Sequence, residues 1–423
     1  MDGNMNRRQF IGSAAAVAAA TTVSGGTSAA AGSGAATAVG STAAQLGPLV
    51  ITRNSGFGQK GKVFPDQRRK YNDAKTGHTV WQMTDTPGRF TRAQYATQPM
   101  ATPDSRFVIY GSDWASDAGQ WNMFKLDLRT GESTQLTEST RNLVYHWSVI
   151  SPDGKEVYYV EDGNSFKVVN IETLEERELC RVTPCHRPHQ LTVSPDNKHI
   201  INPIFLEAKE EENFLFGDGH LIRSALVVIN TKTGEIHRLC DGNTPRTHAQ
   251  YCPTDPNLIM YCYGGPWWYV QRLWMIHADG TGNRPIFIQS HFEGAGHEFW
   301  GTAGKTIYIF CNGGRQPQGL WAVNPDGTNE RCVMAGPTTG HGSANHEEDL
   351  FVASEIYGDN TEGLWMSKKG STEPELLVHT GYDPSKFPSG VGASPHPRFL
   401  PDGKRVVFSS AMTGSPEVFM VEV

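Results

Sequence analysis

The sequence lacks the features that mark several common classes of protein. Its seven cysteines include no Cys-x-x-Cys pair, which excludes zinc ribbons and thioredoxin-like redox centres. Neither the Gly-x-Ser-x-Gly elbow of serine hydrolases nor the His-Glu-x-x-His motif of zinc peptidases occurs. No basic stripe marks a nucleic-acid surface in a chain whose formal net charge is −7. An acidic substrate would therefore need a locally positive site.

Charge is sparse as well, whereas glycine and proline are frequent. Charged residues make up 19% of the 423 residues, and the chain holds 45 glycines and 25 prolines. This usage favours many short strands joined by tight turns and disfavours a helical bundle. Length alone would suggest two or three domains, but a repeat architecture can form one closed unit from the same length.

A nucleotide-binding pattern is present only in its spacing. Residues 56–61 match Gly-x-Gly-x-x-Gly. Such a motif needs a helix immediately after it, so that the helix N-terminus can hold a pyrophosphate. Lys62-Val-Phe-Pro65 follows instead. We therefore expect no dinucleotide site.

The N-terminus has the composition of an export signal. Arg7 and Arg8 precede an Ala-rich apolar stretch that is too short for a stable membrane span. We assign residues 1–36 to a twin-arginine signal and residues 37–77 to a linker or N-terminal extension. The mature protein is then expected in the periplasm or outside the cell, with no membrane span. An oxidising compartment permits disulfides, whose pairing stays open.

From residue 78 to the C-terminus one pattern recurs seven times. In each unit a turn with Pro, Asp, Asn or Gly leads into a strand of β-branched and aromatic residues, followed by a loop and a second strand. The first of these strands begin at Phe107, Val157, His199, Leu258, Lys305, Asp349 and Val406. A single unit cannot bury both faces of its sheet, so the units must stack around an axis until the ring closes.

The predicted fold is all-β: a seven-bladed β-propeller over residues 78–423. The strand beginning at His78 precedes the first full unit, and the last unit ends after its third strand. We expect the N-terminal strand to complete the last blade, which removes an open sheet edge. A tandem of β-sandwiches is the structural alternative.

Six of the fifteen histidines occur at equivalent places, just before or within the first strand of a unit. They are His146, His189, His248, His297, His341 and His396. Because the innermost strands of a propeller line its central channel, we expect these side chains to converge there. Histidine suits both metal binding and proton transfer near neutral pH. Taken singly, each is equally explained as a core or turn histidine.

Several segments resemble the oligogalacturonate lyases. The most specific are His297-Glu-Phe-Trp and His396-Pro-Arg-Phe-Leu-Pro-Asp-Gly-Lys, and the likeness runs from about residue 63 to the C-terminus. The resemblance implies a propeller that cleaves short acidic oligosaccharides by β-elimination, with a divalent metal, Mn²⁺, in its channel. It also implies roles: His248 matches the family's catalytic base, and Arg223 lies at the position of its essential arginine. His297 and His396 match two metal ligands.

The sequence departs from that family at part of the metal site. The family's other ligands are a histidine and a glutamine, where Ser394 and Val391 stand here. Either other side chains complete the metal site, or the metal is absent and cationic side chains carry the charge. In the first case the candidate ligands are His341, foremost as the third metal ligand, His189 and Gln98. In the second case the candidate cations are Arg92 and Arg187. We also expect His189, Arg187, Gln98 and Arg92 to bind the substrate.

Two other functional classes stay open. The Ser-Pro-Asp-Gly-Lys turn also resembles the repeats of TolB-type propellers, which would make the chain a non-catalytic binder of a protein or glycan. A propeller enzyme of another chemistry, such as a sugar hydrolase or epimerase, is the third reading. Product analysis separates these classes, because only elimination gives a conjugated double bond.

Overall fold

The computed structural model describes residues 59–117, 119–139, 141–207, 222–265, 270–336, 340–354, 363–371, 373–381 and 394–423. The expected export signal at residues 1–36, and Val391 of the divergent metal position, lie outside these ranges. Apart from one short 3-10 helix, η1 (Tyr145–Trp147), every element of the described chain is a β-strand.

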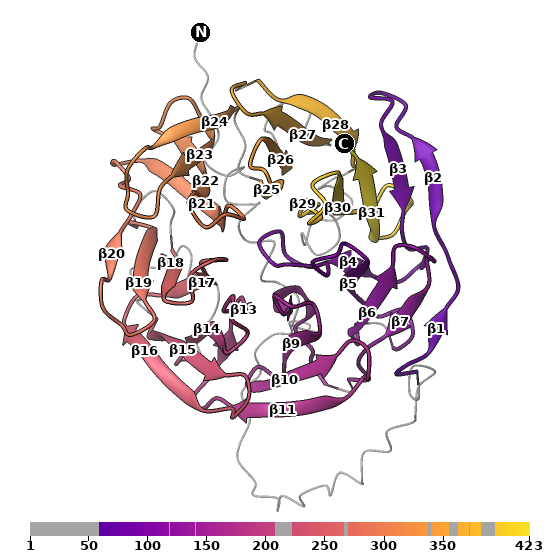
Figure 1. Ribbon diagram of the computed structural model, residues 1–423, viewed down its shortest axis with the longest axis horizontal. Coiled ribbons are helices and arrows are strands. Elements are labelled where there is room, and N and C mark those ends of the chain that lie inside the picture. Colours follow the sequence, from indigo (N-terminus) through magenta and orange to yellow (C-terminus); the bar gives the residue numbers. More distant parts are fainter. Residues whose placement is uncertain are drawn as a thin grey trace, which may run out of the picture.

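Seven antiparallel sheets stand around a central axis as the blades of a propeller (Figure 1). We number the blades along the chain and give their strands from the inner to the outer edge. Blade 1 contains β4 (Thr91–Ala93), β5 (Phe107–Ser112), β6 (Asn122–Asp127), β7 (Ser133–Gln135) and β1 (Val63–Phe64). Blade 2 contains β8 (Val149–Ile150), β9 (Glu156–Glu161), β10 (Ser165–Asn170) and β11 (Glu176–Arg181).

The next blades repeat this plan. Blade 3 contains β12 (Arg187–Pro188) and β13 (Thr192–Val193), which both pair with β14 (His199–Phe205), and then β15 (Ser224–Asn230) and β16 (Ile236–Gly242). Blade 4 contains β17 (Arg246–Tyr251), β18 (Leu258–Tyr263), β19 (Leu273–His277) and β20 (Arg284–Pro285). Blade 5 contains β21 (Glu293–Trp300), β22 (Ile307–Gly313), β23 (Gly319–Val323) and β24 (Arg331–Ala335).

Blade 6 contains β25 (Gly342–Ala344), β26 (Leu350–Ser354), β27 (Gly363–Lys368) and β28 (Glu375–His379). Blade 7 contains β29 (Arg398–Phe399), β30 (Arg405–Ser410), β31 (Glu417–Glu422), β3 (Thr79–Gln82) and β2 (Arg69–Asn72). The predicted seven-bladed propeller is confirmed.

Hydrophobic packing follows the ring. The buried apolar side chains form seven clusters, and each cluster joins two neighbouring blades. The cluster between blades 7 and 1, for example, packs Val407 and Met420 against Val108 and Phe124. Because side chains alternate between the two faces of a strand, every blade is covered on both faces. This closed set of interfaces rules out a tandem of sandwiches.

N-terminal strands complete the last blade. β3 pairs with β31, with Val80 opposite Val421, and β2 adds a fifth strand outside β3. The expectation that an N-terminal strand closes the ring is therefore confirmed. β1 and β2 precede residue 78, however, and β1 pairs with β7. The propeller thus starts earlier than the boundary drawn from the sequence.

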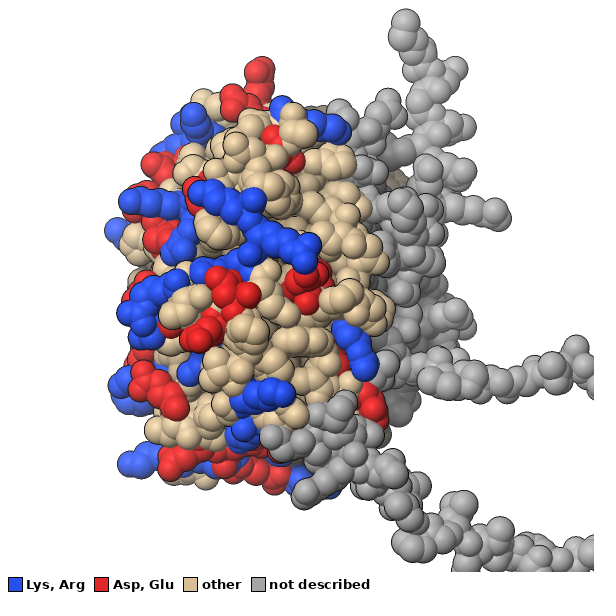
Figure 2. All heavy atoms as spheres, turned by 90° about the vertical axis from the view of Figure 1, so that its right-hand side faces the viewer, with Lys and Arg blue, Asp and Glu red and all other residues tan. Residues whose placement is uncertain are grey.

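The outer surface along β1, β2 and β3 carries charges of both signs. Figure 2 shows basic and acidic side chains interspersed on this side of the ring. Some are paired, such as Arg68 with Asp66 at 2.9 Å and Lys60 with Glu176 at 2.8 Å. Such exposed pairs contribute little to stability, so the blade interfaces dominate the fold.

All seven cysteines, which lie within the described ranges, are free thiols. Among the helices that the structure describes, none has the length and apolar character needed to cross a membrane.

Candidate active site

The inner strands depart from regular β geometry where the histidines lie. In β17 and in β21 the pairing with the neighbouring strand shifts register at the histidine. His248, His297 and His396 have positive φ angles of 48°, 52° and 45°. A non-glycine residue in this conformation costs of order 1–3 kcal/mol, and such bulges re-aim a side chain. The same strained conformation in three blades points to a functional constraint.

Three of the histidines pack against one another in the channel. The ring centroids of His297 and His341 are 3.9 Å apart, and those of His341 and His396 are 4.3 Å apart. Tyr95, which follows β4, lies 4.9 Å from His341 and from His396 between ring centroids, and its hydroxyl is 3.1 Å from Nε2 of His341. Side chains of blades 1, 5, 6 and 7 thus meet.

The other three histidines join this group through two aromatic rings. The ring centroids of His248 and His189 are 4.6 Å apart, and Trp147 stacks on His189 at 4.4 Å. His146 lies 4.6 Å from Trp147. Tyr95 links the two groups, because its ring centroid is 5.7 Å from that of His248. All six histidines expected in the channel therefore lie in one connected cluster.

Burial keeps five of these histidines neutral. Removal from water lowers the pKa well below its ordinary value for His189, His248, His341 and His396. It also lowers the pKa of His146 to about 3. Cations act in the same direction, Arg272 on His248 and Arg92 on His396. Neutral imidazole is the form that accepts a proton or binds a metal.

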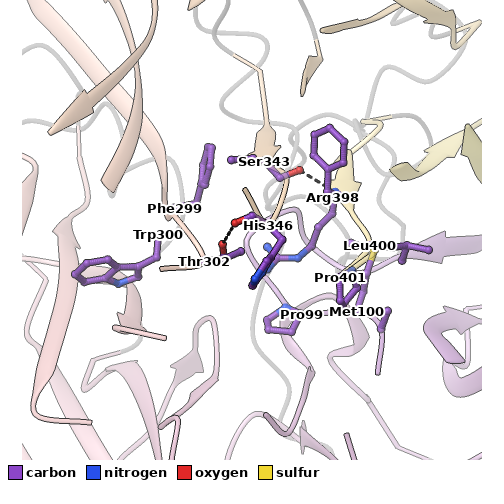
Figure 3. Close-up of a pocket in the computed structure, with 13 residues that line it drawn as sticks. Pro99, Met100, Phe299, Trp300, Thr302, Ser343, His346, Arg398, Leu400 and Pro401 are labelled. Atoms are coloured by element: carbon purple, nitrogen blue, oxygen red, sulfur yellow. Dashed lines mark hydrogen bonds between the residues drawn. The ribbon is translucent and has the colours of Figure 1, made fainter. Parts of the chain in front are cut away.

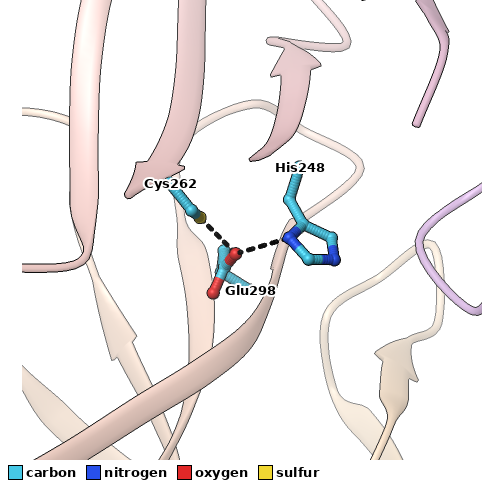
Figure 4. A group of neighbouring side chains, drawn as sticks. All are labelled: His248, Cys262 and Glu298. Atoms are coloured by element: carbon cyan, nitrogen blue, oxygen red, sulfur yellow. Dashed lines mark hydrogen bonds and ion pairs between the residues drawn. The ribbon is translucent and has the colours of Figure 1, made fainter. Parts of the chain in front are cut away.

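A buried carboxylate, that of Glu298, lies beside His248 (Figure 4). Its Oε1 is 4.0 Å from Nδ1 of His248. Arg272 donates hydrogen bonds to both of its oxygens, at 3.0 Å from Nε and 3.2 Å from Nη2, and the thiol of Cys262 donates to Oε1. Burial alone would raise the pKa of Glu298, but the charge and hydrogen bonds of Arg272 outweigh it and hold the pKa below its usual range.

His248, Cys262 and Glu298 place their ligand atoms within 4.8 Å of one another. A metal there would compete with Arg272 for the same carboxylate, and burial raises the pKa of the Cys262 thiol, so the thiol keeps its proton. The group instead orients His248. The carboxylate favours a proton on Nδ1, which leaves the lone pair on Nε2, the nitrogen that points away from Glu298 in Figure 4.

The histidines expected to hold a metal have the ring chemistry for it, although among the described residues only His248, Cys262 and Glu298 bring three ligand atoms within 4.8 Å of one another. Nδ1 of His297 lies 3.0 Å from the carbonyl oxygen of Gly340, which can only accept, so Nδ1 carries the proton and the lone pair lies on Nε2. Nε2 of His396 is buried with no hydrogen-bond partner among the described residues. A buried nitrogen of this kind calls for a partner that the protein does not supply. His341 lies between the two rings, with its Nδ1 3.5 Å from the hydroxyl of Ser394.

The expected cations lie at different depths. Arg92 in β4 is buried, and its Nη2 donates to the carbonyl oxygen of Ser394 at 3.4 Å. Arg187 in β12 is half-buried, and its charge adds to burial in lowering the pKa of His189. Both arginines therefore act on the histidine cluster.

Arg223 lies outside the cluster. It is exposed, directly before β15, and we find no side-chain contact to the histidines among the described residues. Ser224 pairs with Phe205, which in turn pairs with Arg187. Arg223 thus lies at the same end of blade 3 as Arg187, the end at which the inner strand begins.

Gln98 connects blades. Its side-chain nitrogen donates to the carbonyl oxygens of Trp147 at 3.0 Å and Leu191 at 2.7 Å, which ties blade 1 to blades 2 and 3. Its Oε1 is buried and has no hydrogen-bond partner in the described chain. The nitrogen therefore has a structural part.

Sequence reasoning missed four residues that shape this site: Tyr95, Trp147, Arg272 and Glu298. Trp147 directly follows His146 in the sequence, and this adjacency is a signal that could have been used. Glu298 belongs to the His-Glu-Phe-Trp segment, but nothing in the sequence pairs it with Arg272. The two lie in different blades and meet only when blades 4 and 5 pack.

Known proteins similar to this chain agree with the fold. A family model described as oligogalacturonate lyase matches residues 58–362, and a twin-arginine signal model matches residues 4–24, so the protein is exported by that route. The oligogalacturonate lyase of Dickeya dadantii (strain 3937) is 26% identical over 388 residues, which cover 86% of this chain and 98% of the relative.

Two solved structures have the same architecture. An oligogalacturonate lyase in complex with manganese superposes with a TM-score of 0.79 at 25% identity, and the oligogalacturonate lyase of Vibrio parahaemolyticus with a TM-score of 0.78 at 23% identity. Each match covers 86% of this chain and 98% of the other. Since the family model spans most of the propeller, this chain belongs to the oligogalacturonate lyase family.

Proposed function

We propose that this protein is a lyase that cleaves uronate-containing oligosaccharides of the oligogalacturonate type by β-elimination. The observation that carries the proposal is His248, a neutral histidine with Glu298 at Nδ1 and its Nε2 turned away from that carboxylate. A base of this kind suits the removal of a proton next to a carboxylate. Membership of the family supports the same reaction class.

The reaction begins at C5 of a uronate, α to its carboxylate. Nε2 of His248 takes the C5 proton, and the electrons of the C–H bond form the double bond between C4 and C5. The bond from C4 to the glycosidic oxygen breaks, and that oxygen takes up a proton from water. The negative charge of Glu298, 4.0 Å from Nδ1, favours the proton of the resting imidazole on that nitrogen, which leaves Nε2 to accept.

Cationic side chains offset the charge that develops on the substrate. We assign Arg223 to the reacting uronate, because it is exposed at the end of blade 3 where the inner strand begins. We assign Arg92 and Arg187 to carboxylates that reach the cluster. A guanidinium can hold a carboxylate with two parallel hydrogen bonds. We assign His189 and Gln98 to the substrate-binding set as well.

His297 and His396, with His341 as the third ligand, would hold a divalent metal. When bound, the metal neutralises charge on the uronate carboxylate. His341 then compensates for Ser394, which stands where the family has a histidine. We propose manganese as the metal, because a related lyase has been solved with it.

Ultraviolet absorbance of the unsaturated uronate product tests the proposal. With galacturonate oligosaccharides and Mn²⁺ we expect wild-type turnover, and a loss of about 10²–10⁴-fold in His248→Ala, the range for a positioned base. His237→Ala is the matched control, because His237 is exposed on the outer strand β16. No absorbance with galacturonate or glucuronate substrates, with or without Mn²⁺, would reject lyase activity.

Binding of an oligosaccharide without turnover would favour the non-catalytic alternative. The family model favours the lyase over that alternative. Export by the twin-arginine route is consistent with an enzyme that meets its acidic substrate in the periplasm or outside the cell.

A further inference from the structure

A cavity of about 130 Å³ lies in the propeller apart from the histidine cluster (Figure 3). Its walls come from blades 1, 5, 6 and 7. They consist of Pro99, Met100, Ala101, Phe299, Trp300, Thr302, Ser343, Ala344, His346, Arg398, Phe399, Leu400 and Pro401. The wall is mainly apolar and holds one permanent charge, that of Arg398.

Several residues that line the cavity come directly after the clustered histidines in the same chain segments. Phe299 and Trp300 come after His297, and Arg398 comes after His396, in the direction of the turn that ends each inner strand. The rim residues Pro99, His346 and Pro401 are exposed. The cavity therefore opens on the face of the propeller that carries these turns, whereas Arg187 and Arg223 lie at the other end of their blade.

Arg398 is half-buried and has few hydrogen-bond partners among the described residues. Its Nη1 donates to the carbonyl oxygen of Ala96 at 2.8 Å, and among the described residues no carboxylate forms an ion pair with it. A guanidinium carries five N–H donors. An arginine side chain stays charged at neutral pH, so this positive charge is left without an acidic partner in the described chain. In Figure 3 the side chain lies among the cavity residues, close to His346.

We propose that this cavity binds a small organic carboxylate, with the carboxylate on Arg398 and the carbon skeleton against Met100, Phe299 and Trp300. The charge selects an anion, and a planar guanidinium pairs best with a planar carboxylate. The apolar wall selects a body that can leave water, such as an aromatic or sugar ring on Trp300.

The size of the cavity limits the ligand. An engineered cavity of about 150 Å³ accepts one benzene molecule. A single ring with its carboxylate, partly held at the open rim, is the largest ligand that fits, so an oligosaccharide is excluded. This site is therefore distinct from the proposed lyase site, and it does not depend on lyase activity.

Benzoate is the probe, and galacturonate and inorganic phosphate are compared with it. We expect calorimetric binding of benzoate and of galacturonate to the wild-type protein, and a fall in benzoate affinity of at least about tenfold in Arg398→Met, the loss expected for one charge-assisted pair. Arg405→Met is the matched control, because Arg405 is paired with Asp402 at 2.7 Å and lies outside the cavity. His248→Ala should bind benzoate as the wild type does.

A second measurement needs no variant. The indole N–H of Trp300 donates to the carbonyl oxygen of Gln250, so its nuclear magnetic resonance signal reports on this wall of the cavity. Benzoate should shift that signal. Equal affinity in Arg398→Met and wild type, loss of binding in His248→Ala, or an unshifted Trp300 signal would each overturn the proposal. Binding of phosphate in place of both carboxylates would overturn the assigned ligand class.

Discussion

Oε1 of Glu298 lies 4.0 Å from Nδ1 of His248, while the same carboxylate accepts hydrogen bonds from Arg272 at 3.0 and 3.2 Å. The carboxylate is fully buried, and Arg272 is only 3% exposed. One acid therefore serves two purposes: it neutralises a buried cation, and its charge favours a proton on the nearer nitrogen of the proposed base.

Glu298→Gln should destabilise the protein strongly. It removes the charge that neutralises Arg272, and breaking a buried ion pair from one side costs about 3–5 kcal/mol. Urea unfolding should show this fall in the free energy of unfolding. The double variant Arg272→Met/Glu298→Gln should recover much of the loss, because it removes both charges. A single variant as stable as the wild type would mean that the ion pair contributes nothing.

The sequence predicts some contacts of the active site and leaves others hidden. His248, His297 and His396 were predicted to meet because each lies just before or within the first strand of a unit, and the innermost strands of a propeller line its channel. Glu298 and Arg272 could not be paired in this way. Their contact depends on how blades 4 and 5 pack, and no local pattern encodes a contact between blades.

The N-terminal segment contains one strand that the sequence predicts and one that it does not. β3 was predicted because Val80 and its neighbours alternate in polarity. β2 consists of four exposed residues and lacks any alternation, so only its pairing with β3 identifies it as a strand. The cavity at Arg398 was also beyond sequence reasoning, because an unpaired arginine is recognised only by the absence of acids around it.

His297→Ala should lower the metal content of the purified protein by about tenfold or more, since even outer-shell partners of a metal account for 10–100-fold in affinity. Elemental analysis measures this directly. His346→Ala is the matched control, because His346 is likewise followed by a glutamate but is exposed and lies outside the cluster. If both variants keep the wild-type metal content, His297 is not a ligand.

Acidification should destabilise the protein through His146. Its pKa is about 3 in the fold and 6.5 in the reference state, so below pH 6.5 the unfolded chain binds a proton that the folded chain does not. Stability therefore falls as the pH drops from 6.5 towards 3, by about 1.4 kcal/mol per pH unit for this one group. At pH 5 the loss is about 2 kcal/mol.

His146→Phe should lower that slope by about 1.4 kcal/mol per pH unit between pH 6.5 and pH 5, while the other buried histidines keep their share, and His237→Phe should leave the slope unchanged. Unfolding curves at several pH values give the slopes. Identical slopes in His146→Phe and the wild type would show that His146 does not carry the effect.

Val80→Asp should open the ring at its closure. Val80 is fully buried between blades 6 and 7, in a strand that the N-terminal segment contributes to the last blade. A carboxylate there has no cation to pair with in that cluster, so the free energy of unfolding should fall by about 4 kcal/mol or more.

Val63→Asp provides the control: Val63 is 53% exposed on β1, and exposed changes stay within about 0.5 kcal/mol. Since a propeller without its last strand has an exposed sheet edge, Val80→Asp should also aggregate on heating, as light scattering would detect. Equal melting temperatures of the two variants would mean that β3 is dispensable and that the ring is held by the other blade interfaces alone.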